Sequence, residues 1–196
     1  MWYGVGMSTA MRQPMTVEAF LEWEEGQPTR YEFDGFHVFA MTGGSADHAT
    51  VQVNLISELG FRLRGKPCRA FGSELKILAA GSVRYPDAFV VCSPVPGKAT
   101  LVTDPVVVFE ILSPSTSSVD RIIKNQEYRD TPSIQRYVIL EQDRQATTVF
   151  NRDHGDWAGH VITGDTELAM PEIGISIPLS ELYAGVELVV DSPAEQ

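Results

Sequence analysis

One segment of the chain combines an almost continuous apolar run with a single acidic residue. In Pro105–Leu112 (PVVVFEIL) apolar side chains occupy both alternating sets of positions, which is typical of a central β-strand covered on both faces. Glu110 lies inside this run and shares one face of the predicted strand with Val108 and Leu112. Because burying a carboxylate without a partner is costly, we expect a cation or a hydrogen-bond network beside Glu110.

A second acidic residue begins another apolar run. Asp87 opens a predicted strand over residues 87–92. If the two strands are neighbours, Asp87 and Glu110 converge, and paired carboxylates suit Mg²⁺, which takes its remaining ligands from water and phosphate. The alternative is structural: Asp87 is then a turn residue at the start of a strand, and Glu110 is an ion-pair partner.

The remaining pattern predicts one mixed α/β domain with no internal repeat. Apolar residues at helical spacing predict a long helix that follows Gly43-Gly44-Ser45 and ends before Gly65 and Pro67. Asp34-Gly35 separates two short strands and predicts an N-terminal β-hairpin. The other expected elements are a helix capped by Thr16, strands over 68–79 (broken at Gly72), 87–92 and 106–112, a helix over 118–129, strands over 136–140 and 147–150, another hairpin, and a turn at 179–183.

The length of 196 residues suits a single domain, whose boundaries follow from composition. We expect an N-terminal extension at 1–15, one domain at 16–184 and an acidic C-terminal tail at 185–196. The chain contains no run of about 18 apolar residues, so we expect no membrane span. The first residues lack the pattern of a secretory signal, so we expect none. Cys68 and Cys92 show no metal-binding spacing, so we expect buried, inert thiols in a reduced cytoplasmic protein.

The net charge of −11 argues at first sight against a nucleic-acid partner, but the charges are unevenly distributed. Residues 153–196 hold nine acidic side chains and no Lys or Arg, whereas residues 60–84 hold six basic side chains and one acid. Because the local field steers a polyanion more than the net charge does, we expect the basic stretch to contact a DNA backbone through Arg62, Arg64, Lys66 and Arg69. The alternative is an ordinary solvated helix end and loop.

Several short motifs follow one another along nearly the whole chain. They are Arg30–Gly35 (RYEFDG), His48, Phe71–Leu75 (FGSEL), Tyr85–Asp87 (YPD) and Glu110–Thr116 (EILSPST), followed by Asp120, Lys124 and Tyr128. This ordered set resembles the Uma2 family of the PD-(D/E)XK nuclease superfamily from about Thr16 to Leu182. The resemblance implies a restriction endonuclease-like core of the α/β (α+β) class, with a mixed central β-sheet flanked by helices and a metal site at one end of the sheet.

The resemblance also implies roles for individual residues. Asp87 would be the central metal ligand, Glu110 the second carboxylate, and Glu32 a third acid that reaches the site from the hairpin. Mg²⁺ or Mn²⁺ would be the cofactor. The superfamily lysine lies two positions after the second acid, where this chain has Leu112. A leucine cannot activate water or stabilise charge, so the resemblance assigns that role to Lys124 on the following helix.

Four further residues are accessory candidates: His48, Glu74, Asp120 and Tyr128. A phosphate could lie beside His48 at the start of the long helix, and the alternative for this residue is a surface or capping role. Glu74 lies in a predicted strand and could join the acids. Asp120 and Lys124 are four residues apart and could instead form only a surface ion pair. Tyr128 follows one turn later and is a packing residue on the simplest interpretation.

These residues support three hypotheses. The first is a Mg²⁺- or Mn²⁺-dependent endonuclease that hydrolyses DNA phosphodiester bonds, works in the cytoplasm and, by analogy with similar folds, forms a homodimer. The second is a catalytically degenerate nuclease fold kept as a binding or interaction module, which Leu112 and the net negative charge favour. The third is a hydrolase acting on sugars, which a pair of carboxylates permits but nothing else in the chain requires.

Overall fold

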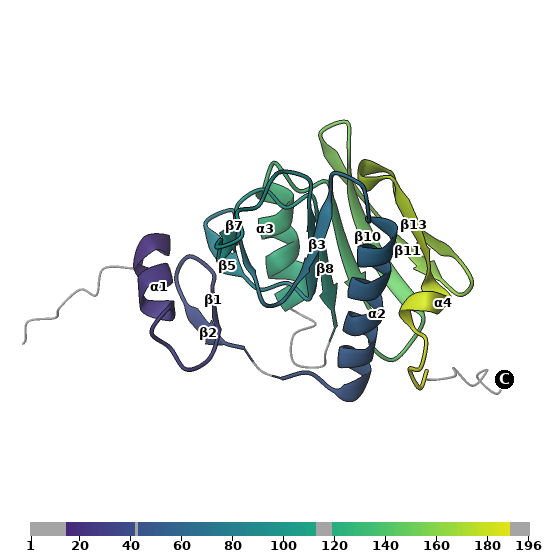
Figure 1. The fold of residues 1–196 in the computed structure, drawn as a ribbon, viewed down its shortest axis with the longest axis horizontal. Helices are drawn as coiled ribbons and strands as arrows, with labels where there is room; N and C mark the ends of the chain where they lie inside the picture. The colour runs from purple at the N-terminus through teal and green to yellow at the C-terminus, as the bar shows by residue number, and fades with distance from the viewer. Residues whose placement is uncertain (1–14, 42, 113–118, 189–196) are drawn as a thin grey trace, which may run out of the picture.

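Strands and helices assemble into two larger β-sheets and one small hairpin sheet (Figure 1). The structure is a computed structural model that describes residues 15–41, 43–112 and 119–188. The six-stranded sheet has the order β11-β10-β9-β8-β6-β3, and within it only the β8–β9 pair is parallel. Its strands are β3 (Arg69–Gly72), β6 (Ala88–Val91), β8 (Val107–Ile111), β9 (Arg136–Leu140), β10 (Ala146–Asp153) and β11 (Asp156–Thr163).

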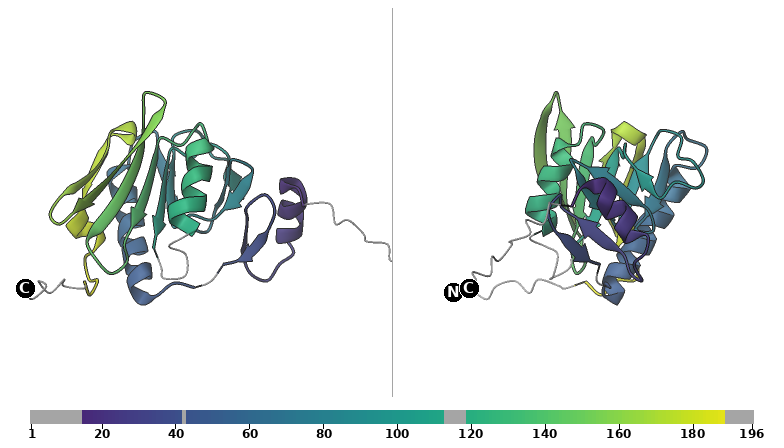
Figure 2. Two further views of the ribbon diagram at one scale, coloured as in Figure 1. Left: turned by 180° about the vertical axis from the view of Figure 1, so that it is seen from behind. Right: turned by 90° about the vertical axis from the view of Figure 1, so that its left-hand side faces the viewer.

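The six-stranded sheet is covered on both faces, as its apolar strands predict. On one face pack α2 (Ala46–Arg62), β12 (Glu167–Met170), β13 (Ile175–Pro178) and α4 (Leu179–Leu182). The opposite face packs against α3 (Asn125–Asp130) and the second sheet. In Figure 1 α2 stands in front of the sheet, and in the reversed view of Figure 2 α3 stands in front of it.

The second sheet is mixed and contains the N-terminal hairpin. Its order is β2-β1-β5-β4-β7, with β4 and β7 parallel. The predicted hairpin is formed by β1 and β2, and Asp34 closes its turn by accepting hydrogen bonds from the backbone N–H groups of Phe36 and His37. The strands are β1 (Tyr31–Phe33), β2 (Val38–Ala40), β4 (Lys76–Ala79), β5 (Ser82–Arg84) and β7 (Leu101–Val102).

The two N-terminal helices begin at side-chain caps, which satisfy backbone N–H groups that have no partner inside a helix. Thr16 caps α1 (Val17–Glu24), and Ser45 caps α2 by accepting from the N–H of His48. The predicted apolar stripe of α2 is confirmed, because its members Val51, Leu55 and Leu59 are fully buried. None of the helices in the described ranges is long and apolar enough to cross a membrane.

The break predicted at Gly72 is confirmed, because β3 ends there and β4 follows in the other sheet. Glu74, which was expected in a strand, lies in the turn between them. The predicted helix over 118–129 is observed as the π-helix η1 (Val119–Lys124) followed directly by α3. A π-helix inserts an extra residue per turn and is common at functional sites.

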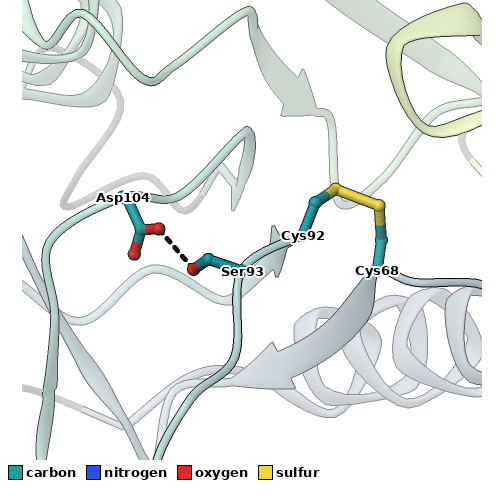
Figure 3. Close-up of a disulfide and its surroundings, with 4 residues drawn as sticks. All are labelled: Cys68, Cys92, Ser93 and Asp104. Carbon is teal, nitrogen blue, oxygen red and sulfur yellow. Dashed lines mark hydrogen bonds between the residues drawn. A yellow bond between two sulfur atoms is a disulfide. The ribbon is translucent and has the colours of Figure 1, made fainter.

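The expectation of two free cysteines is wrong. Cys68 and Cys92 form a disulfide that joins the start of β3 to the end of β6 (Figure 3). These strands pair antiparallel, and their register places the residue before β3 opposite the residue after β6. A separation of 24 residues along the chain hides this contact, which depends on strand pairing and not on local spacing. Next to the disulfide, the hydroxyl of Ser93 donates a hydrogen bond to Asp104.

Candidate active site

Strand pairing brings the two predicted acids together. β6 and β8 run antiparallel with Ala88 opposite Phe109, and extending this register by one residue places Asp87 opposite Glu110. Residues directly opposite one another have Cβ atoms about 4.5–5.5 Å apart on the same face of the sheet. That face also carries Phe89 and packs toward α3. The two acids therefore lie side by side at one end of the central strands.

Asp87 is held by groups from β8 and α2. Its Oδ2 accepts a hydrogen bond from the backbone N–H of Ile111 at 2.7 Å. Its Oδ1 lies 3.4 Å from Nε2 of His48 in the first turn of α2. Gln52, one turn later, donates to the backbone oxygen of Asp87 at 3.0 Å and to Oδ1 at 3.4 Å. These contacts orient the carboxylate, whose side chain is 13% exposed.

Glu110 has the cation and the hydrogen-bond network that its apolar strand predicts. Nζ of Lys124 lies 2.9 Å from Oε1 of Glu110, and the hydroxyl of Tyr128 donates to the same oxygen at 2.8 Å. Burial raises the pKa of Tyr128 and the Glu110 carboxylate raises it further, so the hydroxyl keeps the proton that it donates. Tyr128 also packs edge-on against Tyr137, with 4.8 Å between ring centroids. The Glu110 side chain is only 5% exposed.

Lys124 joins a second acid to this pair. Its Nζ is 3.4 Å from Oε1 of Glu32 on β1, so one buried ammonium lies between carboxylates from two different sheets. Leu112, at the position of the superfamily lysine, packs within the apolar cluster on this face of the sheet. The last residue of η1 is therefore the position that places a cation beside Glu110.

The sequence-based candidates omit two residues of this network, Arg84 and Glu127. The buried guanidinium of Arg84 donates to both oxygens of Glu127, at 2.8 and 2.6 Å, and to Oε2 of Glu32 at 3.2 Å. Burial alone would lower the pKa of Arg84, but the two carboxylates outweigh this effect and the pKa rises. The backbone N–H of Tyr85 donates to Oε1 of Glu32 at 3.0 Å. The sequence signal for Arg84 is a basic residue immediately before the YPD motif.

A cleft of about 610 Å³ opens beside Asp87. Its walls come from the loop after α1, the segment before α2, the first turns of α2, and the turn after β3. Pockets that bind small molecules have volumes of about 300–1,000 Å³, so this cleft is large enough for a small molecule or for one unit of a polymer. Polar side chains dominate its lining, and they include Gln27, Thr29, Arg30, His48, Gln52 and Ser73.

Glu24 also lines the cleft and belongs to a second buried network. Nζ of Lys76 lies 2.5 Å from one oxygen of Glu24, and the hydroxyl of Tyr85 donates to the other at 2.7 Å. Burial alone would raise the pKa of Glu24, but these hydrogen bonds outweigh it and hold the pKa below its usual value. Tyr85 therefore contacts both networks, because its hydroxyl donates to Glu24 and its backbone N–H donates to Glu32.

Comparison with known proteins identifies the family of the chain. Residues 17–180 match the family model of Uma2, which is described as "Putative restriction endonuclease". The chain belongs to the Uma2 family. Two uncharacterized proteins of Synechocystis sp. (strain PCC 6803) are similar to it. The protein slr1290 is 32% identical over 88% of this chain and 93% of its own length, and sll1609 is 27% identical over 69% and 80%.

The fold of this Uma2 protein is shared with a solved structure. A crystal structure from Anabaena variabilis ATCC 29413, titled as a "putative nuclease", matches with a TM-score of 0.71 at 20% identity. The match covers 87% of this chain and 98% of the other. The expectation of a mixed α+β fold, with a mixed sheet flanked by helices and an N-terminal hairpin, is therefore confirmed.

Of the accessory candidates in this Uma2 protein, two contact the paired acids and one lies on the surface beside the cleft. His48 and Tyr128 contact the paired acids, as described above. Glu74 lies in the turn beside the cleft, is 83% exposed, and forms an ion pair with Arg30. The side chain of Asp120 lies outside the described residues, so its proposed pairing stays a prediction.

The four DNA-contact candidates of the Uma2 chain begin at the end of α2 that is far from His48: Arg62 is the last residue of α2, Arg64 and Lys66 follow it, and Arg69 begins β3. With a rise of 1.5 Å per residue, Arg62 is about 21 Å from His48 along the helix axis. Arg62 forms ion pairs with Glu58 and Glu181. Of the others, Arg64 is exposed, Lys66 donates to the backbone oxygen of Gly174, and Arg69 donates to that of Val95. The structure therefore separates these four candidates from the paired acids, whereas Lys76 and Arg84 of the same stretch belong to the buried networks beside them.

The paired acids fit the chemistry of a divalent metal ion. Asp87 and Glu110 supply hard carboxylate oxygens, which Mg²⁺ and Mn²⁺ prefer. Within the described ranges, no three His, Cys, Asp or Glu side chains form a group that could hold a metal. Glu32, the predicted third ligand, is engaged by Arg84 and Lys124. A set of two carboxylates agrees with Mg²⁺, which keeps several waters and binds substrate phosphate.

Proposed function

We propose that this protein is a Mg²⁺- or Mn²⁺-dependent endonuclease that hydrolyses phosphodiester bonds of DNA. The observation that carries the proposal is the placement of Asp87 opposite Glu110 beside a cleft, with the Lys124 ammonium 2.9 Å from Glu110. The description of the Uma2 family supports a nuclease in general. The metal and the DNA substrate are the finer parts of the proposal.

In this proposal Asp87 and Glu110 hold the metal ion, and Glu32 is the third acid of the site. When bound there, a divalent ion lowers the pKa of a water molecule and neutralises charge on the cleaved phosphate. The N–H of Ile111 orients Asp87 in advance, so the carboxylate needs little reorganisation. Lys124 places a positive charge between Glu110 and Glu32, where it stabilises negative charge that develops on the phosphate.

Two further side chains act as positioning residues in this proposal. Arg84 donates to one carboxylate oxygen of Glu32 while the backbone N–H of Tyr85 donates to the other, and Tyr128 donates to Glu110. His48, on the cleft wall at the start of α2, is the proposed contact for a phosphate at that helix end.

A catalytically degenerate nuclease fold is the second candidate. The observation that favours it is Leu112, which occupies the superfamily lysine position and is packed in the apolar core. In this alternative the buried pair of Lys124 and Glu110 serves stability, and the protein binds a partner without cutting it.

Four narrower proposals accompany the function. Residues 16–184 act as one catalytic domain between an N-terminal extension and an acidic tail, and the protein works in the cytoplasm. Homodimer formation is proposed from fold analogy. Arg64, an exposed member of the basic stretch, is the first candidate there for a DNA backbone contact, because Arg62 already binds two carboxylates while Lys66 and Arg69 donate to backbone oxygens.

Titration of Mn²⁺ into the purified protein by calorimetry tests the proposal. The wild type should bind, and Asp87→Asn should lose binding because one carboxylate ligand is removed while the side-chain shape is kept. Asp156→Asn is the matched control, since it removes the same charge from an exposed position on β11. The control should bind as the wild type does.

The titration is repeated with a short DNA duplex and with single-stranded DNA, because substrate phosphate supplies some ligands. Absence of binding by the wild type under all three conditions would overturn the metal proposal and favour the degenerate fold. Binding that survives in Asp87→Asn would overturn the assignment of Asp87.

A further inference from the structure

The cleft beside Asp87 has a size and a lining that go beyond a metal site. Its volume of about 610 Å³ is more than two carboxylates and a metal ion require. The lining continues away from Asp87 to Gln27, Thr29 and Arg30, which follow α1 and approach the site from the second sheet. Such a polar extension suits the part of a substrate that flanks the reacting bond.

Arg30 is anchored in the cleft in a way that leaves its charge available. Its guanidinium donates to the backbone oxygen of Ser73 at 3.3 Å and lies 5.9 Å from the ring centre of Tyr85. Its partner carboxylate, Glu74, is 83% exposed, and Arg30 itself is 40% exposed. Exposed ion pairs contribute little to stability, so a substrate phosphate can replace Glu74 at little cost.

The depth of the acids restricts the shape of the substrate. Asp87 lines the cleft and its side chain is only 13% exposed, so a phosphodiester must enter the cleft to reach this carboxylate. The backbone of a base-paired strand is part of a broad, stiff duplex that does not fit into a narrow cleft. An unpaired nucleotide can rotate about its backbone and enter such a cleft.

The distribution of basic side chains also favours contact with one or two phosphates over an extended contact along a DNA duplex. In the stretch 60–84, several cations are bound by carboxylates of the same chain: Arg62 by Glu58 and Glu181, Lys76 by Glu24, and Arg84 by Glu32 and Glu127. Duplex affinity depends on many Lys and Arg side chains that neutralise successive phosphates. Cations that are neutralised within the protein do not supply this contribution.

We propose that the cleft binds one unpaired nucleotide of single-stranded DNA, with a phosphate of that nucleotide on Arg30 and the adjoining phosphodiester directed to Asp87. This inference rests on the proposed nuclease function and names its substrate class. In the free protein Arg30 forms its ion pair with Glu74, and the phosphate replaces Glu74 when the nucleotide binds.

Binding of a short fluorescein-labelled oligothymidylate, measured by fluorescence anisotropy in EDTA, tests this inference without metal or cleavage. Arg30→Gln should weaken binding by about tenfold or more, the value of a hydrogen bond to a charged group. Glu74→Gln is the matched variant, because it breaks the same ion pair from the other side. It should tighten binding, since it removes the carboxylate that competes with phosphate for Arg30.

The opposite effects of the two variants distinguish a binding role from a structural one. If Arg30→Gln and Glu74→Gln weaken binding equally, or neither changes it, the pair is structural and the inference is overturned. A duplex of the same length should bind more weakly and respond little to Arg30→Gln. Duplex binding that equals single-strand binding, with the same loss in Arg30→Gln, would overturn the single-strand assignment.

The experiment also separates this inference from the proposed function. Opposite effects of the two variants, without Mn²⁺ binding by the wild type, would support the cleft and refute the metal-dependent nuclease. Metal-dependent cleavage with the same KM in the wild type and Arg30→Gln would support the nuclease and overturn the cleft assignment.

Discussion

Replacing Glu110 tests the buried charge network, because Glu110 and Lys124 depend on one another. Glu110→Ala removes the carboxylate 2.9 Å from the Lys124 ammonium and leaves the cation with Glu32 at 3.4 Å. At an effective dielectric constant of about 20, charges 2.9 Å apart attract by about 6 kcal/mol, which desolvation of both groups partly offsets. We expect Glu110→Ala to lower the free energy of unfolding by about 3–5 kcal/mol, the range for breaking a buried pair from one side.

Two more variants separate charge from shape. Glu110→Gln keeps an oxygen that can accept from Tyr128 and Lys124, so it should cost less, about 1–3 kcal/mol. The double variant Glu110→Ala/Lys124→Met removes both charges of the pair. Its loss should be smaller than the sum of the two single losses, since neither partner is left buried without the other.

Urea unfolding at pH 7 measures these free energies, and the slope of each transition shows whether the comparison is valid. Asp156→Asn, on the exposed strand β11, is the control and should change stability by less than about 0.5 kcal/mol. A loss below about 1 kcal/mol for Glu110→Ala, or additive losses in the double variant, would refute the reasoning. The pair would then behave as a solvated contact.

Two further predictions concern Glu24 and the disulfide. Burial alone would raise the pKa of Glu24, but hydrogen bonds from Lys76 and Tyr85 lower it, so its stabilisation is present above about pH 4.5 and is lost as the pH falls through the lowered pKa. Urea unfolding at several pH values measures this loss. In Glu24→Gln the unfolding free energy should fall less between about pH 4.5 and more acidic pH than it does in the wild type, and an equal fall in both proteins would contradict the prediction. Cys68→Ser/Cys92→Ser should lose about 3 kcal/mol, because the disulfide closes a loop with a separation of 24 residues. Thiol titration of the unfolded, unreduced wild type should find no free thiol in this pair, and two reactive thiols would refute the bond.

Local patterns were sufficient where an element has a strong period of its own. The apolar spacing of α2 predicts a helix that buries Leu55, and Asp34-Gly35 predicts the hairpin of β1 and β2. In the segment 68–79 the break at Gly72 was predicted correctly, but β-propensity does not tell which sheet a strand joins. Its two halves pair with different partners, so the chain turns between them at Glu74.

The candidate site divides in a similar way. The motif order predicts that Asp87, Glu110 and Lys124 belong together, and the structure places Lys124 on Glu110. Arg84 was visible only as a basic residue of a charged stretch that immediately precedes the YPD motif. Its importance depends on complete burial between Glu32 and Glu127, which no property of its own strand indicates.

The sequence by itself determined that Asp87 and Glu110 are unusual, because a carboxylate within an apolar strand requires partners. Only the tertiary structure decided which partners they have. The β6–β8 register brings the two acids together, and the π-helix η1 carries Lys124 to Glu110. The pairing of β3 with β6 brings the two cysteines together. These contacts depend on strand order and register between segments far apart in the chain, and local periodicity encodes neither.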